Sequence, residues 1–428
     1  MTKTIVEPHR PQVGHCDLDG EDEGAPRGAD GAPCREKIVG GEDPEFRFPE
    51  RASRHATAAT CYAPGRSPLR SAIVWASGNK WAAGAAAFLL CMYGMALFAG
   101  FFAPYGMNQT HYKAPADYRY HHPMRPRVLD QEGGLHWPPF VYGTKPLGSP
   151  DRGYAEDRTV RHKLKLFARG EPYSLFFGLL EWDRHLIGVE EPGKVFLLGT
   201  DKLGRDLLSR IIYGSRISLS VGLLGIAITF CLGLAIGATS GLLGGYPDSI
   251  LMRLSEVVMS LPGLYLVVAL AGVLPPELSS DTRYLLIVVI LSLVGWAGPA
   301  RVIRGMVLSI RENDYVLAAK AVGAGTPRIV LHHVIPNTMS YIIVAATISV
   351  PYYILGEVSL SFLGVGVMEP QASWGLMLSD AQSVTALREF TWLLLPGAFL
   401  FLVVMSFNIL GDGLRDALDP RARGTRAL

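Results

Sequence analysis

Side chains that could perform chemistry are few in this 428-residue chain, and their spacing forms no catalytic motif. The five cysteines are Cys16, Cys34, Cys61, Cys91 and Cys231. They lie far apart without a CxxC pair, so they predict neither a disulfide framework nor a zinc cluster. No GxxxxGK[ST] loop occurs, so we expect that the chain does not itself bind and hydrolyse ATP. No local Ser/His/Asp or Cys/His pattern indicates nucleophilic catalysis. The sequence predicts a non-enzyme without a cofactor.

Histidines are the other residues that could bind a metal. The candidates are His111, His121, His122, His136 and His162. Because they lack the spacing typical of a metal site, we interpret them as solvated side chains. The sequence therefore predicts no metal site.

The most informative polar segment is Arg311 to Asn337, RENDYVLAAKAVGAGTPRIVLHHVIPN. Asn313 or Asp314 can cap a short helix that runs to Val322. Gly323 and Gly325 permit the left-handed conformation that ends such a helix. This half of the segment predicts a short, well-capped helix.

The second half of the segment carries its own signals for a helix. Thr326 can cap it, with Pro327 in the first position, where a missing N–H costs nothing. Pro336 should end it, and Asn337 can cap the helix that follows. The pattern predicts a compact helix–turn–helix whose exposed surface includes Tyr315, Val316 and Ala319. The small side chains around Ala318 and Ala319 should let another protein dock closely there.

Apolar windows on both sides of this segment predict the elements that position it. The composition, 49% hydrophobic and 18% charged, is ordinary for a soluble protein, but it averages unlike segments. Five windows have the length that spans a bilayer, about 20 residues, and a sixth, 284–300 with 17 residues, can extend past Arg301 to Leu308 if that arginine snorkels. They are 82–103, 217–247, 257–276, 284–300, 334–356 and 390–411. A soluble core would need several uncharged helices buried on all sides, so we predict an all-α polytopic membrane protein with six transmembrane helices.

Basic residues predict the orientation of these helices. The connection between the fourth and fifth windows carries Arg301, Arg304, Arg311, Lys320 and Arg328, whereas the short loops near 277–283 and 364–389 hold one arginine each. The positive-inside rule therefore predicts both termini in the cytoplasm. The net charge of +2 argues against a nucleic-acid partner.

The remaining segments complete the predicted organisation. Residues 1–80 are polar and rich in Gly and Pro, and we expect them to be disordered or to follow from a start codon assigned too early. The first span is 81–104, an extracytoplasmic loop is 105–200, a core with five spans is 201–412, and a cytoplasmic tail is 413–428.

Several positions inside this frame carry further predictions. Residues 199–216 have an apolar face and a polar face, which predicts either an interfacial helix, with Asp206 and Arg210 paired, or a polar lead-in to the second span. Glycines 233, 237, 241 and 245 should let another helix approach closely. Prolines 262, 299, 351 and 396 should interrupt four spans. Glu357 lies beside an apolar stretch and should either line a pathway or lie at the membrane interface.

The 311–337 segment resembles the EAA loop of bacterial ABC importer permeases. Ala318, Ala319, Gly323 and Pro336 match with the family's spacing, and Ile335 fills the apolar position before the proline. Leu317 stands where the family has glutamate, and His333 stands at the first apolar position.

The resemblance covers about 220 residues and is to the second permease subunit of dipeptide, oligopeptide and nickel importers. It rests on GTDKLGRDLLSRIIYGSRISLSVG, YPDSILMRLSEVVMSLPGLYLVVAL and GEVSLSFLGVGVMEPQASWG. The matching positions are Asp201, Gly204, Arg205, Asp206, Asp248, Arg253, Pro262 and Glu357. The resemblance implies two ATPase subunits, a second permease and an extracytoplasmic binding protein as partners. It also implies a peptide cargo, whose class the sequence leaves open between dipeptide, oligopeptide and nickel chelate.

Two other classes of protein compete with this interpretation. A secondary transporter would be expected to show internal repeats and several intramembrane ionisable residues. A membrane-anchored structural or receptor protein would rely on residues 104–200 and would have no need for the capped hairpin. Neither expectation fits this sequence as well as the permease.

Overall fold

The computed structural model describes residues 79–111, 117–130, 134–147, 153–175, 180–190 and 192–418. These residues belong to one compact unit, Arg66–Leu428. Residues 1–78 of the predicted disordered segment and the last ten residues of the predicted tail lie outside the described residues.

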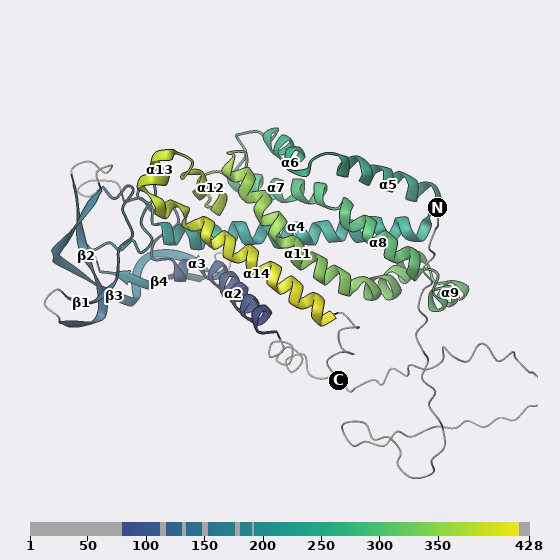
Figure 1. Ribbon diagram of the computed structural model, residues 1–428, viewed down its shortest axis with the longest axis horizontal. Helices are drawn as coiled ribbons and strands as arrows, with labels where there is room; N and C mark the ends of the chain where they lie inside the picture. The colour runs from purple at the N-terminus through teal and green to yellow at the C-terminus, as the bar shows by residue number, and fades with distance from the viewer. Residues whose placement is uncertain are drawn as a thin grey trace, which may run out of the picture. The chain divides into compact units, whose positions relative to one another are not determined.

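Helices make up most of the described chain (Figure 1). The longer ones are α2 (Lys80–Leu97), α4 (Leu207–Leu243), α5 (Gly245–Ser260), α6 (Gly263–Gly272), α7 (Ser280–Gly295), α8 (Ala297–Ile310), α11 (Ile335–Phe362) and α14 (Leu395–Leu418). The shorter ones are α3 (Ala99–Phe102), α9 (Asp314–Ala321), α10 (Thr326–Ile329), the π-helix η2 (Val330–Val334), α12 (Trp374–Ser379), α13 (Val384–Glu389) and the 3₁₀ helix η3 (Thr391–Leu394).

Four helical runs are long and apolar enough to cross a membrane: Lys80–Leu97, Leu207–Leu243, Thr326–Phe362 and Thr391–Leu418. Two further pairs reach that length only together, because α5 and α6 meet at a bend of 86° and α7 and α8 at a bend of 44°. The described chain therefore has four candidate spans, or up to six if each bent pair is one span. Each predicted apolar window falls on one of these runs.

The all-α prediction is wrong for part of residues 105–200. A four-stranded antiparallel sheet forms there in the order β1-β2-β3-β4, from Arg127–Leu129, Leu135–Pro146, Tyr154–Leu175 and Leu180–Val189. The polar strand β3 is long enough to pair with β2 through its first half and with β4 through its second half. An apolar cluster of Met124, Val141, Val195 and Phe196 packs at the sheet.

A separate interfacial helix before the second span is also absent. The apolar positions from Leu207 onward belong to α4 itself, which continues for 37 residues to Leu243. Asp206 caps its first turn by accepting a hydrogen bond from the Ser209 backbone N–H at 2.8 Å. At 1.5 Å per residue α4 is about 55 Å long, more than the roughly 30 Å hydrocarbon layer needs.

The glycine spacing in α4 predicted close helix packing, and the structure confirms it for three of the four positions. Gly233, Gly237 and Gly241 are buried against α8. A Cβ atom at Gly237 would lie 2.5 Å from the Ala300 carbonyl oxygen. Gly245 instead begins α5 and has open space around it.

Substituting Gly237 with leucine should destabilise the protein because its side chain would meet backbone of α8 that cannot rotate away. Overpacking of this kind costs about 1–3 kcal/mol and sometimes more. The matched control is Gly305→Leu in α8, where nothing lies within 4 Å of the new Cβ. Unfolding in detergent should show a clear loss of stability only for the first variant. Equal stability of the two would contradict the tight α4–α8 contact.

Three of the four prolines lie at or near interruptions. Pro262 is the N-cap of α6 at the sharp α5–α6 bend, Pro299 lies in the first turn of α8, and Pro396 lies in the first turn of α14. Pro351 is different, since α11 runs through it without a break. The prediction of four interrupted spans is therefore wrong at Pro351.

The two ends of α4 define where the candidate sites lie. Its first residues follow the 199–206 turn beside the sheet, where Gly199 accepts from the Leu207 N–H. Near its other end, the Gly241 carbonyl accepts a hydrogen bond from Arg311 at 3.0 Å, just before α9 begins. The sheet and α9 thus lie at opposite ends of this helix, as Figure 1 shows.

Candidate functional site

The predicted helix–turn–helix of residues 311–337, which we call the coupling segment, begins with α9. Val316 is fully buried in an apolar cluster with Val307, Ile310, Ile329 and Val334. The prediction that Val316 is exposed is therefore wrong, because this one side chain fastens the short helix to the end of α8. It holds the remaining surface of α9 in a fixed orientation.

The opposite surface of α9 is open. Tyr315 is 44% exposed and Leu317 47%, and Val322 at the end of the helix is 87% exposed. Ala318 is exposed between them, and Ala319 is half-buried. Apolar side chains with small residues beside them form the kind of surface that another protein can cover.

The turn after α9 follows the predicted chemistry at Gly323 but not at Gly325. Gly323 has a φ of +84°. Its N–H donates to the Lys320 carbonyl and the next N–H, of Ala324, donates to the Ala319 carbonyl, both at 2.9 Å. This paired arrangement is the Schellman C-cap, which needs a left-handed residue. Gly325 has a φ of −70° and is instead the N-cap of α10.

The second half of the coupling segment does not end at Pro336. The helices α10, η2 and α11 form one run, Thr326–Phe362, in which Pro336 lies in the first turn of α11. Asn337 does not cap a new helix but donates from its side-chain amide to the His333 carbonyl at 2.6 Å. The π-turn of η2 precedes the proline, and half-buried Ile335 lies beside it. Such π-turns interrupt the regular backbone ladder without ending the helix.

Two ion pairs connect α5 with α8 near this end of the bundle. Asp248 accepts two hydrogen bonds at 2.5 Å from Arg304, and Ser240 of α4 also donates to it. Glu256 accepts from Arg253 at 2.7 Å and from Arg301 at 3.4 Å. Arg304, which the sequence singled out only for topology, is therefore the partner of Asp248.

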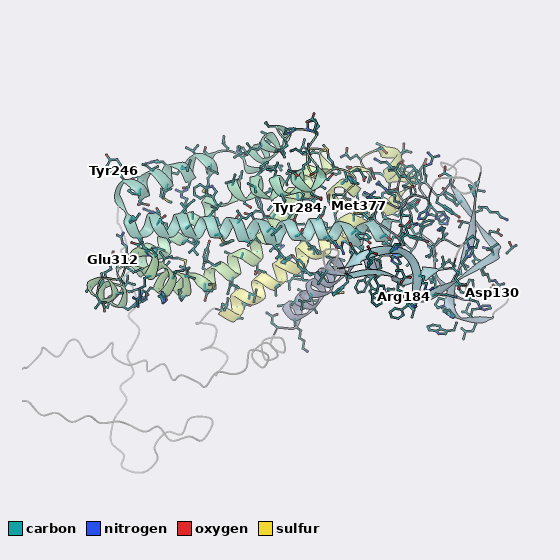
Figure 2. All side chains as sticks on the ribbon, turned by 180° about the vertical axis from the view of Figure 1, so that it is seen from behind. Asp130, Arg184, Tyr246, Tyr284, Glu312 and Met377 are labelled. Carbon is teal, nitrogen blue, oxygen red and sulfur yellow. The ribbon has the colours of Figure 1, made fainter. Side chains whose placement is uncertain are left out.

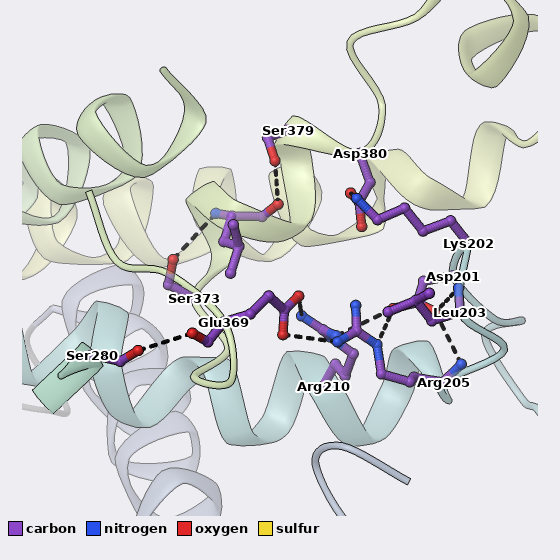
Figure 3. Close-up of polar contacts among 11 residues, drawn as sticks. Asp201, Lys202, Leu203, Arg205, Arg210, Ser280, Glu369, Ser373, Ser379 and Asp380 are labelled. Carbon is purple, nitrogen blue, oxygen red and sulfur yellow. Dashed lines mark hydrogen bonds and ion pairs between the residues drawn. The ribbon is translucent and has the colours of Figure 1, made fainter. Parts of the chain in front are cut away.

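At the other end of α4, four charges meet in a cluster that we call the Asp201 ion cluster, formed by Asp201, Arg205, Arg210 and Glu369 (Figure 3). Asp201 and the two arginines are buried, whereas the Glu369 side chain is 46% exposed. Asp201 accepts from Arg205 at 2.6 Å and from Arg210 at 3.2 Å. Glu369, from the loop after α11, accepts from the same two guanidinium groups at 2.8 and 3.2 Å. Arg210 therefore does not pair with Asp206 as predicted.

The backbone of the 199–206 turn holds this cluster. Asp201 also accepts from the N–H groups of Leu203 and Arg205 at 2.8 and 2.9 Å. Gly204 has a φ of +69°, and a Cβ there would lie 3.2 Å from the His111 backbone. Burial raises the pKa of Asp201, and the charge and hydrogen bonds of Arg205 oppose that rise. The turn thus presents one carboxylate to two buried cations.

Neighbouring contacts extend the cluster to other elements. Lys202 pairs with Asp380 after α12 at 2.7 Å, and this hydrogen bond raises the pKa of Lys202. Ser280 at the start of α7 donates to the Glu369 carbonyl at 3.0 Å. One network thus joins the starts of α4 and α7 to the segment between α11 and α13. Glu369 was missed as a site residue because its partners are about 160 residues away in the sequence.

Glu357 lies neither on a pathway surface of this chain nor at an exposed interface. It is fully buried in α11 and accepts from Ser361 at 2.7 Å and from Ser218 of α4 at 3.1 Å. Its carboxylate fastens α11 to α4, so it lines no exposed surface of this chain, and its predicted depth at the membrane interface stays a prediction.

One of the five candidate histidines, His121, differs from the prediction that they are solvated, whereas the other four are partly exposed. His121 is fully buried, its Nε2 lies 2.9 Å from the Thr144 hydroxyl, and burial lowers its pKa to about 3. Among the described residues, no group of three or more His, Cys, Asp or Glu side chains could hold a metal ion.

Two family models match the chain. Residues 233–424 match the binding-protein-dependent transport system inner membrane component, and residues 67–123 match the N-terminal TM domain of oligopeptide transport permease C. The first match covers α5 to α14 with the coupling segment. The second covers α2 and α3 of the first predicted span and the residues that follow up to position 123.

Curated relatives are similar over about half of the chain. The dipeptide transport system permease protein DppC of Bacillus subtilis (strain 168) is 45% identical over 53% of this chain and 68% of its own length. The oligopeptide transport system permease protein OppC of the same organism is 40% identical, over 54% of this chain and 74% of its own. The OppC protein of Haemophilus influenzae is 42% identical, over 53% and 70%.

Proposed function

The chain belongs to the family of inner membrane components of binding-protein-dependent transport systems, and from this premise we propose that it carries peptides across the membrane. It is a bacterial membrane protein and a permease subunit of an ABC importer, not the ATPase of that importer. The peptide cargo is inferred from the names of its relatives.

We propose that six membrane-spanning segments form the permease, with α5–α6 and α7–α8 each counted as one span. The arginines near α8 and α9 support a cytoplasmic position for the coupling segment. An even number of spans then returns both termini to the cytoplasm, and residues 105–200 become extracytoplasmic.

The single observation that carries the coupling role is α9, held by buried Val316 and ended by the left-handed Gly323 with its outer face open. ATP binding can shift a permease between two states only through contacts that differ between them, so the contact element must be stiff. We infer that the surface formed by Tyr315, Ala318 and Ala319 docks on an ATPase subunit. Ile335 and Pro336, at the start of α11, complete the same coupling segment.

The complete importer would contain three kinds of partner protein. Two ATPase subunits would supply the energy, and a second homologous permease would form the other half of the pathway. An extracytoplasmic binding protein would deliver the cargo. The absence of a phosphate-binding loop in this chain supports the assignment of ATP hydrolysis to the partners.

Replacing Ala318 with tryptophan tests the docking surface. The bulky side chain should prevent close docking and lower peptide uptake by at least about tenfold, the effect of about 1.4 kcal/mol. The measurement is uptake into proteoliposomes, together with the amount of ATPase that copurifies. Ala155→Trp, at an exposed position in β3, is the control and should keep the ATPase bound. Normal uptake and normal copurification of the Ala318 variant would contradict the coupling role.

The cargo class is tested by the same proteoliposomes. Labelled dipeptide, a longer peptide and a nickel chelate are offered in separate assays with the cognate binding protein. We expect uptake of at least one peptide and none of the nickel chelate. Uptake of the nickel chelate alone would overturn the peptide assignment and leave the permease assignment intact.

A further inference from the structure

The bent helix pairs α5–α6 and α7–α8 carry charged side chains on their exposed surfaces. Each pair forms one candidate span, and α5 and α8 lie side by side, joined by the Asp248–Arg304 ion pair. Figure 2 labels Tyr246, at the start of α5, and Glu312, just after α8, at the same end of the bundle. Glu256 lies about 17 Å along α5 from its first residue, at 1.5 Å per residue. It therefore belongs to the candidate span and not to a loop.

The exposed surface of α5 has a polar side and an apolar side. The polar side repeats at i, i+4, i+7 and i+11 and consists of Ser249, Arg253, Glu256 and Ser260. The apolar side has the same spacing one residue later and consists of Ile250, Leu254, Val257 and, directly after the helix, Leu261. Residues with this spacing share one side of a helix. Lipid suits the apolar side, whereas charges at membrane depth face water or other protein groups.

Helix α8 shows the reverse of a lipid-facing pattern. Its buried side is apolar and includes Ala300, Ile303 and Val307. Its open side carries small and polar residues around one valine, namely Gly298, Arg301, Val302, Gly305 and Ser309. A Cβ at Gly298 or Gly305 would meet no atom of the described residues within 4 Å. A membrane helix with a polar open side lines a water-filled cavity or contacts protein, because lipid leaves such polar groups unsatisfied.

The two polar sides meet in an ion triad, the Glu256 triad, formed by Arg253, Glu256 and Arg301. Glu256 accepts a hydrogen bond from Arg253 at 2.7 Å and from Arg301 at 3.4 Å. The three side chains are 82%, 40% and 42% exposed, in that order. Two guanidinium groups share one carboxylate, so the triad has one positive charge in excess. The triad therefore complements an anion, and a carboxylate matches the two parallel donors of a guanidinium group.

We propose that the Glu256 triad lines the cytoplasmic half of the translocation pathway and binds the C-terminal carboxylate of a peptide before its release. This inference rests on the peptide-importer function proposed above. The excess positive charge attracts the carboxylate of a peptide and repels its amino terminus. The open glycines of α8 let the peptide backbone approach beside Arg301. The apolar side of α5 is left for lipid, so the two sides of this helix separate the pathway from the bilayer.

The first test asks whether water reaches this surface. Gly305→Cys and Leu254→Cys are made separately in a full-length chain without its native cysteines and assembled into the complete importer in nanodiscs. A charged, membrane-impermeant thiol reagent should modify Gly305→Cys at least about tenfold faster than Leu254→Cys, because lipid excludes the charge. A rate at position 305 no higher than at position 254 is expected if lipid or the second permease covers the surface, and it would overturn the proposal.

The second test measures recognition of the carboxylate as protection of Gly305→Cys from the same reagent. A peptide with a free C-terminus should protect it, and the same peptide as a C-terminal amide should need an about fivefold higher concentration, the effect of one solvent-screened ion pair. Adding Arg301→Gln should raise the half-protecting concentration of the free peptide to that of the amide. Adding Glu256→Gln, which removes the competing carboxylate, should lower it. Equal protection by the free peptide and the amide with the triad unchanged would overturn the proposal.

Control variants separate this site from general effects on the importer. Arg415→Gln removes an exposed arginine near the end of α14 and should leave both half-protecting concentrations unchanged. If Arg301→Gln does not assemble, Arg253→Gln gives the same readout, since the Arg253 side chain is 82% exposed. Peptide uptake by the wild type without selective protection would overturn the role of the Glu256 triad alone. Selective protection without peptide uptake would instead contradict the transport function proposed above.

Discussion

Replacing Asp201 with leucine is expected to lower the free energy of unfolding by about 3–5 kcal/mol, because it leaves buried cations without their shared acceptor. Arg205 and Arg210 are 3% and 1% exposed, and each donates to Asp201. Glu369 would remain as the one carboxylate for both guanidinium groups. Two N–H groups of the turn, those of Leu203 and Arg205, would also lose their acceptor.

The chain offers a closely matched control for this variant. Glu256 is also a carboxylate shared by two arginines, Arg253 and Arg301, but its side chain is 40% exposed. Glu256→Leu should therefore cost no more than about 1 kcal/mol, since water replaces the lost partner. The free energy of unfolding in mixed micelles is measured for both variants. Similar losses of unfolding free energy for the two variants would mean that burial of Asp201 does not increase the stability that the Asp201 ion cluster contributes.

A double variant tests whether the loss of stability in Asp201→Leu comes from a buried arginine left without its carboxylate. Asp201→Leu with Arg210→Met removes one buried cation together with the acceptor, leaving Arg205 with Glu369. Replacing both partners of a buried pair by apolar groups is often close to neutral. We therefore expect the double variant to be more stable than Asp201→Leu alone. A further loss of stability instead would point to Arg210 as a packing residue.

The sequence predicted the helical segments well because their signals are local. Charge-free windows and glycine spacing depend on residues within a few turns, and they predict a close helix contact at Gly237, although not that its partner is α8. The Schellman turn at Gly323 is local in the same sense. Even the missed strand β3 has a local signal, since Val160, Leu164 and Leu166 alternate with basic residues, a pattern with the period of a strand.

Contacts between distant segments could not be predicted in this way. Glu369 meets Arg205 and Arg210 only because the loop after α11 returns to the start of α4. Val316 was predicted to be exposed together with Tyr315 and Ala319, but its burial depends on Ile329 of α10 and Val334 of η2, which lie more than ten residues away in the sequence. The burial of Glu357 likewise depends on Ser218 of α4.

The two ends of the bundle are connected through α4 and the helices packed on it. The Asp201 ion cluster fixes the first turns of α4, while Arg311 donates a hydrogen bond to the Gly241 carbonyl at the other end. Close contact with α8 along the glycine positions joins the two helices between these points. A displacement of α9 would therefore act on a helix pair that is packed backbone against backbone, and such elements move as rigid bodies.

Replacing Gly323 with valine is expected to lower peptide uptake by about tenfold or more, because a left-handed residue costs an L-amino acid about 1–2 kcal/mol and a β-branched one more. The φ of +84° at this position supports both hydrogen bonds that end α9. The space around Gly323 is open, so the new side chain itself meets no atom within 4 Å. The expected defect is therefore in the backbone of the coupling segment, with membrane insertion unchanged.

Two further variants separate backbone conformation from side-chain size. Gly323→Asn should retain more uptake than Gly323→Val, since asparagine adopts the left-handed region more readily. Gly325→Val, two residues away with a φ of −70° and its nearest neighbour at 3.8 Å, should leave uptake close to that of the wild type. Uptake and ATP hydrolysis are measured together in proteoliposomes. If the coupling segment must be stiff, Gly323→Val should hydrolyse ATP without peptide uptake, and Gly325→Val should not show this defect. Equal defects in the two variants would mean that the size of the added side chain, and not the backbone conformation, causes the loss.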